Sequence, residues 1–267
     1  MQTCKTECRL SQFFLDHEKP VIFICSEWQK KSEPSTVYLV YRWIIALILF
    51  ITLIMSIADV EHPEMPSSQK IKWLIYFTHW ANILYAFQTL FNAVLLTKCM
   101  VLYTRQESNW EDVPFKWYKV YWVTNVIATD VAFGVTFWFH TLIYDKETMG
   151  FSALNYFNHI NNSLLMMLDL FVVAHPIRLL HFIYPLLFVL FYGFFSIIYY
   201  WAGGLSRQDT DFIYGSLDWN KPGQTTVINF FCMIFFVLLH TFCWGLYQFR
   251  LWLHSKFYPP EDHSEGR

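Results

Sequence analysis

The sequence has little charge and little glycine. Only 15% of the 267 residues are charged, whereas 55% are hydrophobic and 21% aromatic, and nine are glycine. An ordinary soluble domain carries about 25% charged residues. This balance therefore excludes most soluble classes and favours a membrane protein. With a formal charge of −2 and no basic stripe, we expect no nucleic-acid partner.

The sequence also lacks a recognisable metal motif. Its six cysteines include no CxxC pair, and Cys4 and Cys8 have no matching histidine pair. We therefore expect no metal site and no cofactor. Cys4, Cys8 and Cys25 precede the first apolar run and are candidates for palmitoylation, although reduced thiols in the cytosol are the simpler interpretation.

Long apolar runs define the predicted architecture. The first 36 residues are polar and mixed, so we expect no cleavable signal peptide. Six runs are each long enough to cross a bilayer, which predicts an all-α polytopic membrane protein with six transmembrane helices. The predicted spans cover about residues 37–57, 71–96, 117–144, 151–174, 182–201 and 226–253. They form one transmembrane domain, 37–253, between polar tails of residues 1–36 and 254–267.

The distribution of Lys and Arg predicts the orientation. If the N-terminus is cytosolic, 13 of the 19 basic residues lie on the cytosolic side and five on the outer side. This excess predicts that both termini are cytosolic. The remaining one, Arg42, lies about one turn inside the first span, and we expect its side chain to snorkel to the headgroups.

The fourth predicted span is unusually polar. Polar groups at bilayer depth cost several kcal/mol unless they are satisfied. On a helix, six of its side chains fall within about one third of the circumference. They are Asn155, Asn158, His159, Asn162, Met166 and Asp169. This face should meet protein or a wet cavity, either as packing between helices or as a site.

Two further spans carry polar faces. The second repeats Thr78, Asn82, Tyr85, Thr89 and Asn92 along one side. The third offers Asn125, Thr129, Thr136 and His140. Helix packing is the default role of such residues in a membrane. If they instead line a pocket, the candidates are Asn82, Tyr85, Asn158, Asp169, Asn125 and His140.

One pair of side chains is placed for chemistry by its depth. Thr78 and His159 lie about seven and eight residues into spans that both enter from the outer side, so both sit roughly 10–12 Å below the outer boundary. A hydroxyl and an imidazole at one level suit a nucleophile and its general base. A substrate or ion pathway through Asp130 and Asp169 is an alternative, although no inverted repeat supports a transporter.

Three blocks carry a family resemblance. They are KPVIFICSEWQKKSEPSTVYLVYRWIIALI, FNHINNSLLMMLDLFVVAHPIRLLHFIYP, and IIYYWAGG with LDWNKPGQT. The chain resembles the rolling stone proteins over residues 19–254. These are multi-pass membrane proteins named for a role in myoblast fusion. The resemblance implies a plasma-membrane protein that supports cell–cell fusion or muscle development through membrane partners or lipids.

A more distant resemblance implies an enzyme. FTHWANIL, YDKE and NHINNS are similar to the androgen-induced membrane family, whose characterised members hydrolyse fatty-acid esters of hydroxy fatty acids. By this resemblance Thr78 matches the required threonine and implies a fatty-acyl ligand. The family motif NHxxH ends in the catalytic histidine, but here Asn162 holds that position, and His159 matches the first histidine.

An amide cannot accept a proton as imidazole does. The catalytic candidates are therefore Thr78 as nucleophile, His159 as a substitute base, and Asn162 or Asn82 as a donor to the oxyanion. The other interpretation is a hydrolase scaffold that has lost its chemistry, so whether the protein is an enzyme stays open.

Overall fold

The computed structural model describes residues 9–60, 64–107, 110–143 and 156–258. Within them, five helices are long and apolar enough to cross a membrane. They are α2 (Thr36–Ala58), α4 (Phe77–Thr104), α5 (Asp112–Trp138), α9 (Ile183–Trp201) and α10 (Pro222–Phe257). The described residues otherwise form short helices and connections, with one isolated β-bridge between Ser26 and Val173. The prediction of an all-α membrane protein is confirmed.

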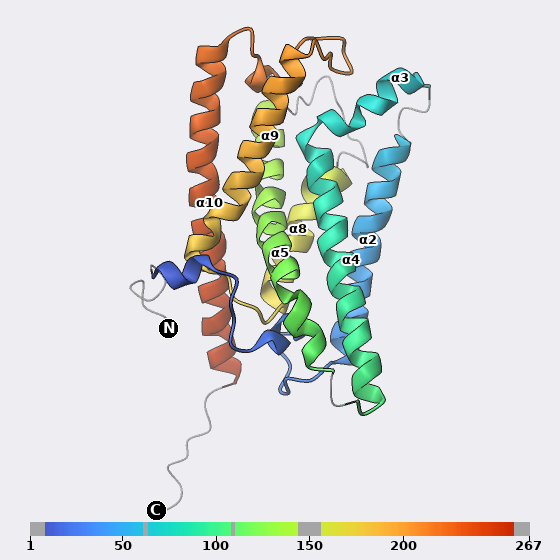
Figure 1. The fold of residues 1–267 in the computed structure, drawn as a ribbon, viewed down its shortest axis with the longest axis vertical. Coiled ribbons are helices and arrows are strands. Elements are labelled where there is room, and N and C mark those ends of the chain that lie inside the picture. Colours follow the sequence, from blue (N-terminus) through green and yellow to red (C-terminus); the bar gives the residue numbers. More distant parts are fainter. Residues whose placement is uncertain (1–8, 61–63, 108–109, 144–155, 259–267) are drawn as a thin grey trace, which may run out of the picture.

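The polar fourth span has a shorter helix than the other five. Residues 151–155 of the predicted span lie outside the described part. The π-helix η5 (Phe157–Asn161) then leads into α8 (Asn162–Val172). This helix runs in the same direction as α4 within the bundle (Figure 1). The count of six spans stays a prediction.

The second and sixth helices differ from their predicted bounds. Residues 71–75, placed in the second span from the sequence, form the 3-10 helix η3 (Ile71–Ile75) after the short α3 (Ser67–Lys70). Tyr76 is extended, so α4 begins only at Phe77. At the other end of the chain, α10 starts with Pro222 at its first turn, where a missing N–H costs nothing.

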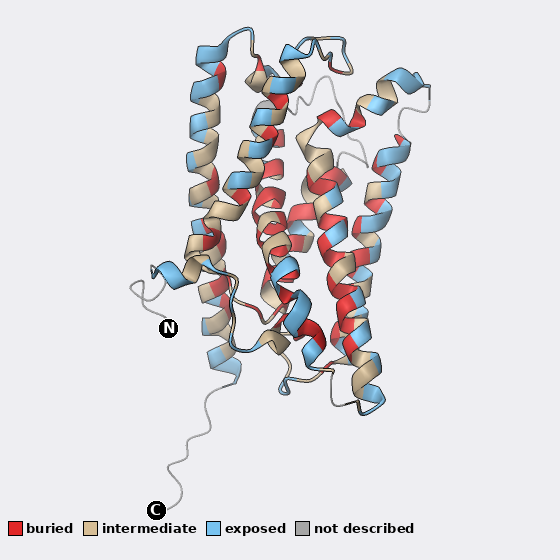
Figure 2. Cartoon of the chain, viewed as in Figure 1, coloured by how far each residue is buried: buried red, intermediate tan, exposed pale blue. Residues whose placement is uncertain are grey.

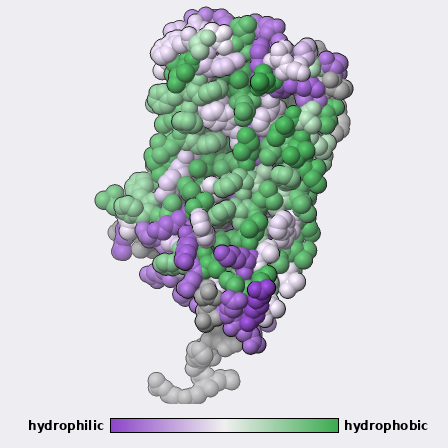
Figure 3. Space-filling model, turned by 45° about the vertical axis from the view of Figure 1, so that its right-hand side comes forward, coloured by the Kyte–Doolittle hydropathy of each residue, from purple (hydrophilic) through white to green (hydrophobic). Residues whose placement is uncertain are grey.

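The surface has a broad apolar belt. On the face drawn in Figure 3, hydrophobic side chains cover the middle of the molecule and hydrophilic ones lie at its two ends. On α9, Phe191, Phe194 and Ile198 are each more than 60% exposed. Bare aromatic and aliphatic side chains over such an area suit lipid rather than water. The chain is therefore an integral membrane protein.

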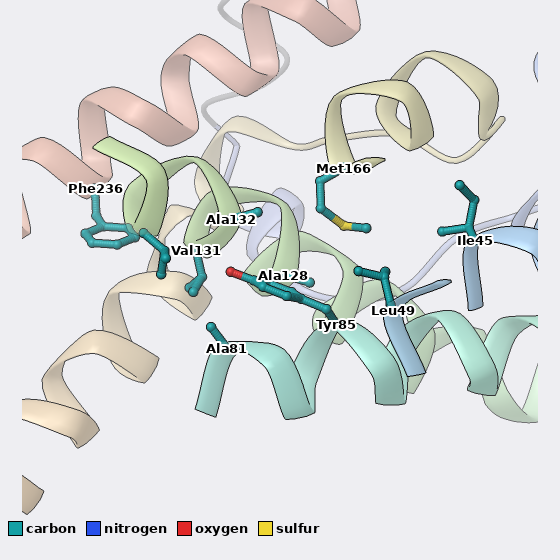
Figure 4. Packing of buried hydrophobic residues seen from close by; sticks show 10 residues of the cluster. Ile45, Leu49, Ala81, Tyr85, Ala128, Val131, Ala132, Met166 and Phe236 are labelled. Carbon is teal, nitrogen blue, oxygen red and sulfur yellow. The ribbon is translucent and has the colours of Figure 1, made fainter. Parts of the chain in front are cut away.

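The core lies where α2, α4, α5 and α8 meet. Ile45 and Leu49 of α2, Tyr85 of α4, Val131 of α5 and Met166 of α8 converge there (Figure 4). Alanines line the contact and let the helices approach closely. They are Ala81, Ala128 and Ala132, all fully buried.

The N-terminal segment is packed into one end of the bundle. It contains the 3-10 helices η1 (Leu10–Phe13) and η2 (Pro20–Ile24), and Phe23 and Ile24 are fully buried. The Phe23 ring stacks on His175, with centroids 5.3 Å apart. Residues 9–35 therefore lie against the helices and are not a detached tail. This segment and the end of α10 lie at the same end of the molecule (Figure 1), while the side of the membrane they occupy stays a prediction.

The same segment completes the end of α8. The last carbonyls of a helix have no partner within it. Here the Glu27 N–H donates to the Val172 carbonyl (2.9 Å) and the Trp28 indole to the Phe171 carbonyl (2.7 Å). The Arg250 guanidinium donates to the carbonyl of Leu170 (2.8 Å). Because these groups are satisfied, α8 can end inside the protein.

Candidate functional site

Three asparagines join α4 to η5 and α8. The Asn82 amide donates to the Asn158 side-chain oxygen (2.9 Å) and accepts from the Asn162 amide (3.0 Å). All three residues are buried. The predicted polar faces of the second and fourth spans thus face each other. Neutral amides exchange hydrogen bonds but take up no proton, so this cluster binds the helices together and can only donate or accept hydrogen bonds toward a ligand.

Asp169 pairs with an arginine that we expected elsewhere. Arg42 Nη1 lies 2.5 Å from Asp169 Oδ1, and both side chains are at most 1% exposed. The Tyr41 hydroxyl (3.0 Å) and the Asn125 amide (3.3 Å) also donate to the carboxylate. The expectation that Arg42 snorkels to the headgroups is therefore wrong. A buried carboxylate without a cation would cost several kcal/mol, and the guanidinium at the same level supplies that cation.

Aromatic rings complete the surroundings of Arg42. Its guanidinium lies over Tyr121 at 5.5 Å and Tyr38 at 5.9 Å. Its Nε and Nη2 atoms have no hydrogen-bond partner, and ring faces stabilise a cation in their place. Tyr85, a predicted pocket residue, turns its hydroxyl into the core, where that oxygen also has no partner.

A second buried pair joins α5 to α10. His240 Nδ1 lies 2.7 Å from Asp130 Oδ2, and His240 Nε2 lies 2.9 Å from the Arg178 carbonyl. Both neighbours of the ring are acceptors, so the pair must hold two protons, either as imidazolium and carboxylate or as imidazole and carboxylic acid. Sequence reasoning considered Asp130 for a transport pathway and missed this partner. A histidine in the last span was the only available signal.

The structure does not bring Thr78 and His159 together as a hydrogen-bonded pair. The Thr78 side chain reaches the Tyr214 hydroxyl, which also accepts from the Phe77 N–H (3.0 Å). The His159 ring stacks on Phe139, with centroids 3.6 Å apart and planes 3° apart. His159 Nδ1 is buried without a hydrogen-bond partner.

Thr78 lines a cavity of about 120 Å³ between α4, α5, α9 and α10. Its walls are mostly apolar, and Tyr214 and Ser216 from the connection between α9 and α10 add hydroxyl groups. Phe139 also lines the cavity, and its ring is the one stacked on His159. His140, predicted as a pocket residue, is exposed and does not line this cavity.

Hydroxyl groups hold the π-helix η5 and the first turn of α8 against α5. The Thr136 hydroxyl donates to the His159 carbonyl, and the Ser163 hydroxyl donates to the Ala132 carbonyl (2.8 Å). Such π-helical turns are rare and frequent at functional sites. Within the described part of the chain, no three His, Cys, Asp or Glu side chains are grouped to hold a metal ion.

Comparison with known proteins gives the family. The family model described as Protein rolling stone matches residues 2–259. Protein rolling stone of Drosophila melanogaster is 30% identical over 269 residues, covering 95% of this chain and 93% of that protein. No solved structure matches the chain. Because the match extends over nearly the whole length of both proteins, this chain belongs to the rolling stone family.

Proposed function

We propose that this protein supports cell–cell fusion, as in myoblasts, or muscle development, acting through membrane partners or lipids. The observation that carries the proposal is family membership over residues 2–259. The apolar belt and the five membrane-length helices among the described residues support a role within a membrane. We further propose the plasma membrane as its location, with both termini in the cytosol, because the basic residues favour that orientation.

The connections at the α3 end of the bundle favour a supporting role. Arg207, in the connection between α9 and α10, pairs with Asp59 at 3.0 Å. Lys72 of η3 pairs with Asp209 at 3.1 Å and donates to the Ser206 carbonyl at 2.8 Å. These contacts hold residues 206–209 against η3 and the end of α2. A chain whose described connections lie this close to the bundle acts beside other fusion components and does not span two membranes by itself.

Deletion in fusing cells tests this role. Myoblasts that lack the protein should fuse less, and the wild-type protein should restore fusion. Thr78→Ala should restore fusion equally, because the proposed role breaks no bond. Turnover of lipid esters should be the same in both cell lines. Normal fusion in the null cells would contradict the proposal.

A second candidate function is intramembrane hydrolysis of lipid esters. It is favoured by the position of Thr78 on an apolar cavity and by the buried, unpartnered Nδ1 of His159. Thr78 would be the nucleophile and His159 the base, with Asn162 or Asn82 as donor to the oxyanion. For this chemistry a ring nitrogen of His159 must approach Thr78 Oγ within about 3.5 Å.

A fluorophosphonate probe distinguishes this alternative. In intact membranes an active threonine should be labelled, and Thr78→Ala should abolish the label. Thr89→Ala is the matched control, because Thr89 is a buried threonine of the same helix whose hydroxyl bonds to the Tyr85 carbonyl at 2.8 Å. Absence of labelling at a saturating probe concentration would exclude this chemistry.

A further inference from the structure

The cavity beside Thr78 adjoins a second hollow on the lipid-facing side of the molecule. A second hollow shares Trp138, Tyr214, Ser216 and Ile228 with it. That hollow also includes Phe231 of α10, whose side chain is 61% exposed on the apolar belt. The second hollow therefore places the cavity next to the lipid-facing surface, beside α10 and the connection before it.

The side chains that line the cavity favour a hydrocarbon ligand. Along its depth they are apolar, with Val135, Val189, Ile228 and Phe236 among them. The volume of about 120 Å³ is several times what one water molecule needs. Apolar cavities of this size stay dry and take up hydrocarbon, and an empty one loses the dispersion contacts of its walls. In a bilayer the hydrocarbon within reach is lipid.

A glycine keeps one wall of this cavity open. Gly193 lies within α9, where glycine costs about 0.5–1 kcal/mol relative to alanine. A Cβ added there would meet only Asn229 Oδ1, at 3.9 Å. By contrast, a Cβ on Gly134 of α5 would lie 2.6 Å from the Phe236 ring, so that glycine is needed for close packing. Gly193 serves no close contact, and its effect is to leave volume in the cavity.

We propose that this cavity binds the hydrocarbon chain of a membrane lipid and that Gly193 provides the room for it. The chain enters past Phe231, and its oxygen-bearing end lies toward the hydroxyls of Thr78 and Ser216. Hydroxyl groups at one end of an apolar pocket are the usual means of orienting such a ligand. The inference goes beyond the fusion role and requires no hydrolysis.

Photolabelling tests the site directly. The purified protein is placed in phosphatidylcholine vesicles that contain a small fraction of phosphatidylcholine with a diazirine on one acyl chain. After illumination, mass spectrometry locates the label. We expect label on the cavity residues Val189 and Cys232. Gly193→Phe should lower that labelling at least fivefold, because the new ring fills the cavity.

A matched control separates filling from general disturbance. Gly245 is an exposed glycine of α10 with nothing within 4 Å of an added Cβ, and it does not line the cavity. In the Gly245→Phe variant, Val189 and Cys232 should be labelled to the same extent as in the wild type. If Gly193→Phe aggregates, Val189→Phe fills the same cavity from one turn away, and label is then followed at Cys232.

Two outcomes would overturn the inference. One is wild-type label confined to belt residues such as Phe191, and the other is unchanged label at Cys232 in a folded cavity-filling variant. The result is also independent of the proposed function. Cavity labelling with normal fusion in null cells would preserve the lipid site and refute the fusion role.

Discussion

The four helices of the core and the pair α9 and α10 are built differently. Half of the most apolar stretch of α4 and 61% of that of α5 are buried, but only 17% of the corresponding stretches of α9 and α10 (Figure 2). Within a bilayer, burying an apolar side chain gains little, because lipid is equally apolar. Polar contacts must therefore specify which helices associate, and the core has most of them.

The core and the pair also differ in how they are joined. Arg42 and Asp169 join α2 to α8, and three asparagines join α4 to the same helix. The Asp130–His240 pair connects α10 to α5. The Tyr192 hydroxyl of α9 donates to the Ile75 carbonyl of η3 (2.8 Å). The cavity lies on the boundary between the two parts, lined by residues of α4, α5, α9 and α10.

The largest effect should follow from breaking the Arg42–Asp169 pair. Arg42→Leu leaves a buried carboxylate without its cation, and such losses cost about 3–5 kcal/mol. Denaturant unfolding of the purified protein in detergent measures the change. The double variant Arg42→Leu with Asp169→Leu should recover much of the loss, because no charge remains buried. Wild-type stability in the single variant would show that the core does not depend on this pair.

A smaller and more local effect should follow from His240→Leu. It removes the imidazole from the Asp130 carboxyl and from the Arg178 carbonyl, at a cost of about 2–3 kcal/mol. If the core and the pair α9 and α10 are stabilised separately, the rate of amide hydrogen exchange should rise in α10 and stay the same in the four core helices. Thr241→Leu is the control, because Thr241 is the exposed neighbour of His240 on the same helix. Exchange that rises equally in α4 would mean that the two parts form one cooperative unit.

The sequence could predict which faces turn inward but not which residues meet. The faces of α4 and α8 follow from the helical repeat, and Asn82, Asn158 and Asn162 do lie opposite one another. The partner of Asp169 could not be predicted, because a single charge near a span end fits either snorkelling or burial. The N-terminal PVIFI motif was likewise too short to distinguish from a polar tail, although Phe23 is fully buried.

The position of the His159 side chain relative to Thr78 could not be predicted, for a different reason. Counting residues gives the depth of a side chain along a helix. Its direction around the helix axis, however, can be predicted only if every preceding turn is a regular α-helical turn. Phe139 and His159 both lie in π-helical turns, whose wider hydrogen-bond spacing shifts the faces that follow. Nothing in the sequence marks these turns, so the stacking of His159 on Phe139 could not be predicted.

The asparagine cluster allows a sharper version of the comparison. Asn82→Ala removes two side-chain hydrogen bonds between core helices and should cost about 1–2 kcal/mol. Asn229→Ala on α10 should change stability by less than about 0.5 kcal/mol, because the Asn229 amide bonds only within its own helix, to the Thr225 carbonyl. Unfolding of both variants under one set of conditions measures the difference. Equal losses would contradict the contrast between core and pair.

The packed N-terminal segment should loosen in acid. Burial, with the Arg250 charge nearby, holds the pKa of His175 well below its usual 6.5, and burial lowers the pKa of His17 as well. Both histidines have a lower pKa in the folded protein than in the unfolded chain. Their contribution to the stability of the packed segment is therefore complete above about pH 6.5 and is lost as the pH falls below it. Just below pH 6.5, we expect the free energy that favours the packed segment to fall by about 1 kcal/mol per pH unit. Faster proteolysis within residues 9–35 measures this change.

His175→Phe isolates the contribution of His175 to this dependence. The variant keeps a ring against Phe23, so its protection at neutral pH should be close to that of the wild type. Its proteolysis rate should rise less between pH 7.5 and pH 5.5. An unchanged pH dependence would assign the effect to His17 or to other groups of the segment.

The smallest effect tests the boundary between the two parts. Gly193→Ala should raise stability by up to about 0.5–1 kcal/mol, because alanine restricts the unfolded chain and its Cβ meets nothing closer than 3.9 Å. Gly134→Ala should instead lower stability by about 1–3 kcal/mol, because its Cβ would lie 2.6 Å from Phe236. Denaturant unfolding in detergent measures the free energy of unfolding of both variants. If both variants lose stability, there is no free volume beside Gly193 and the cavity has no room for a lipid chain. Opposite signs mean that the same substitution is tolerated beside the cavity but not where Phe236 of α10 packs closely on α5.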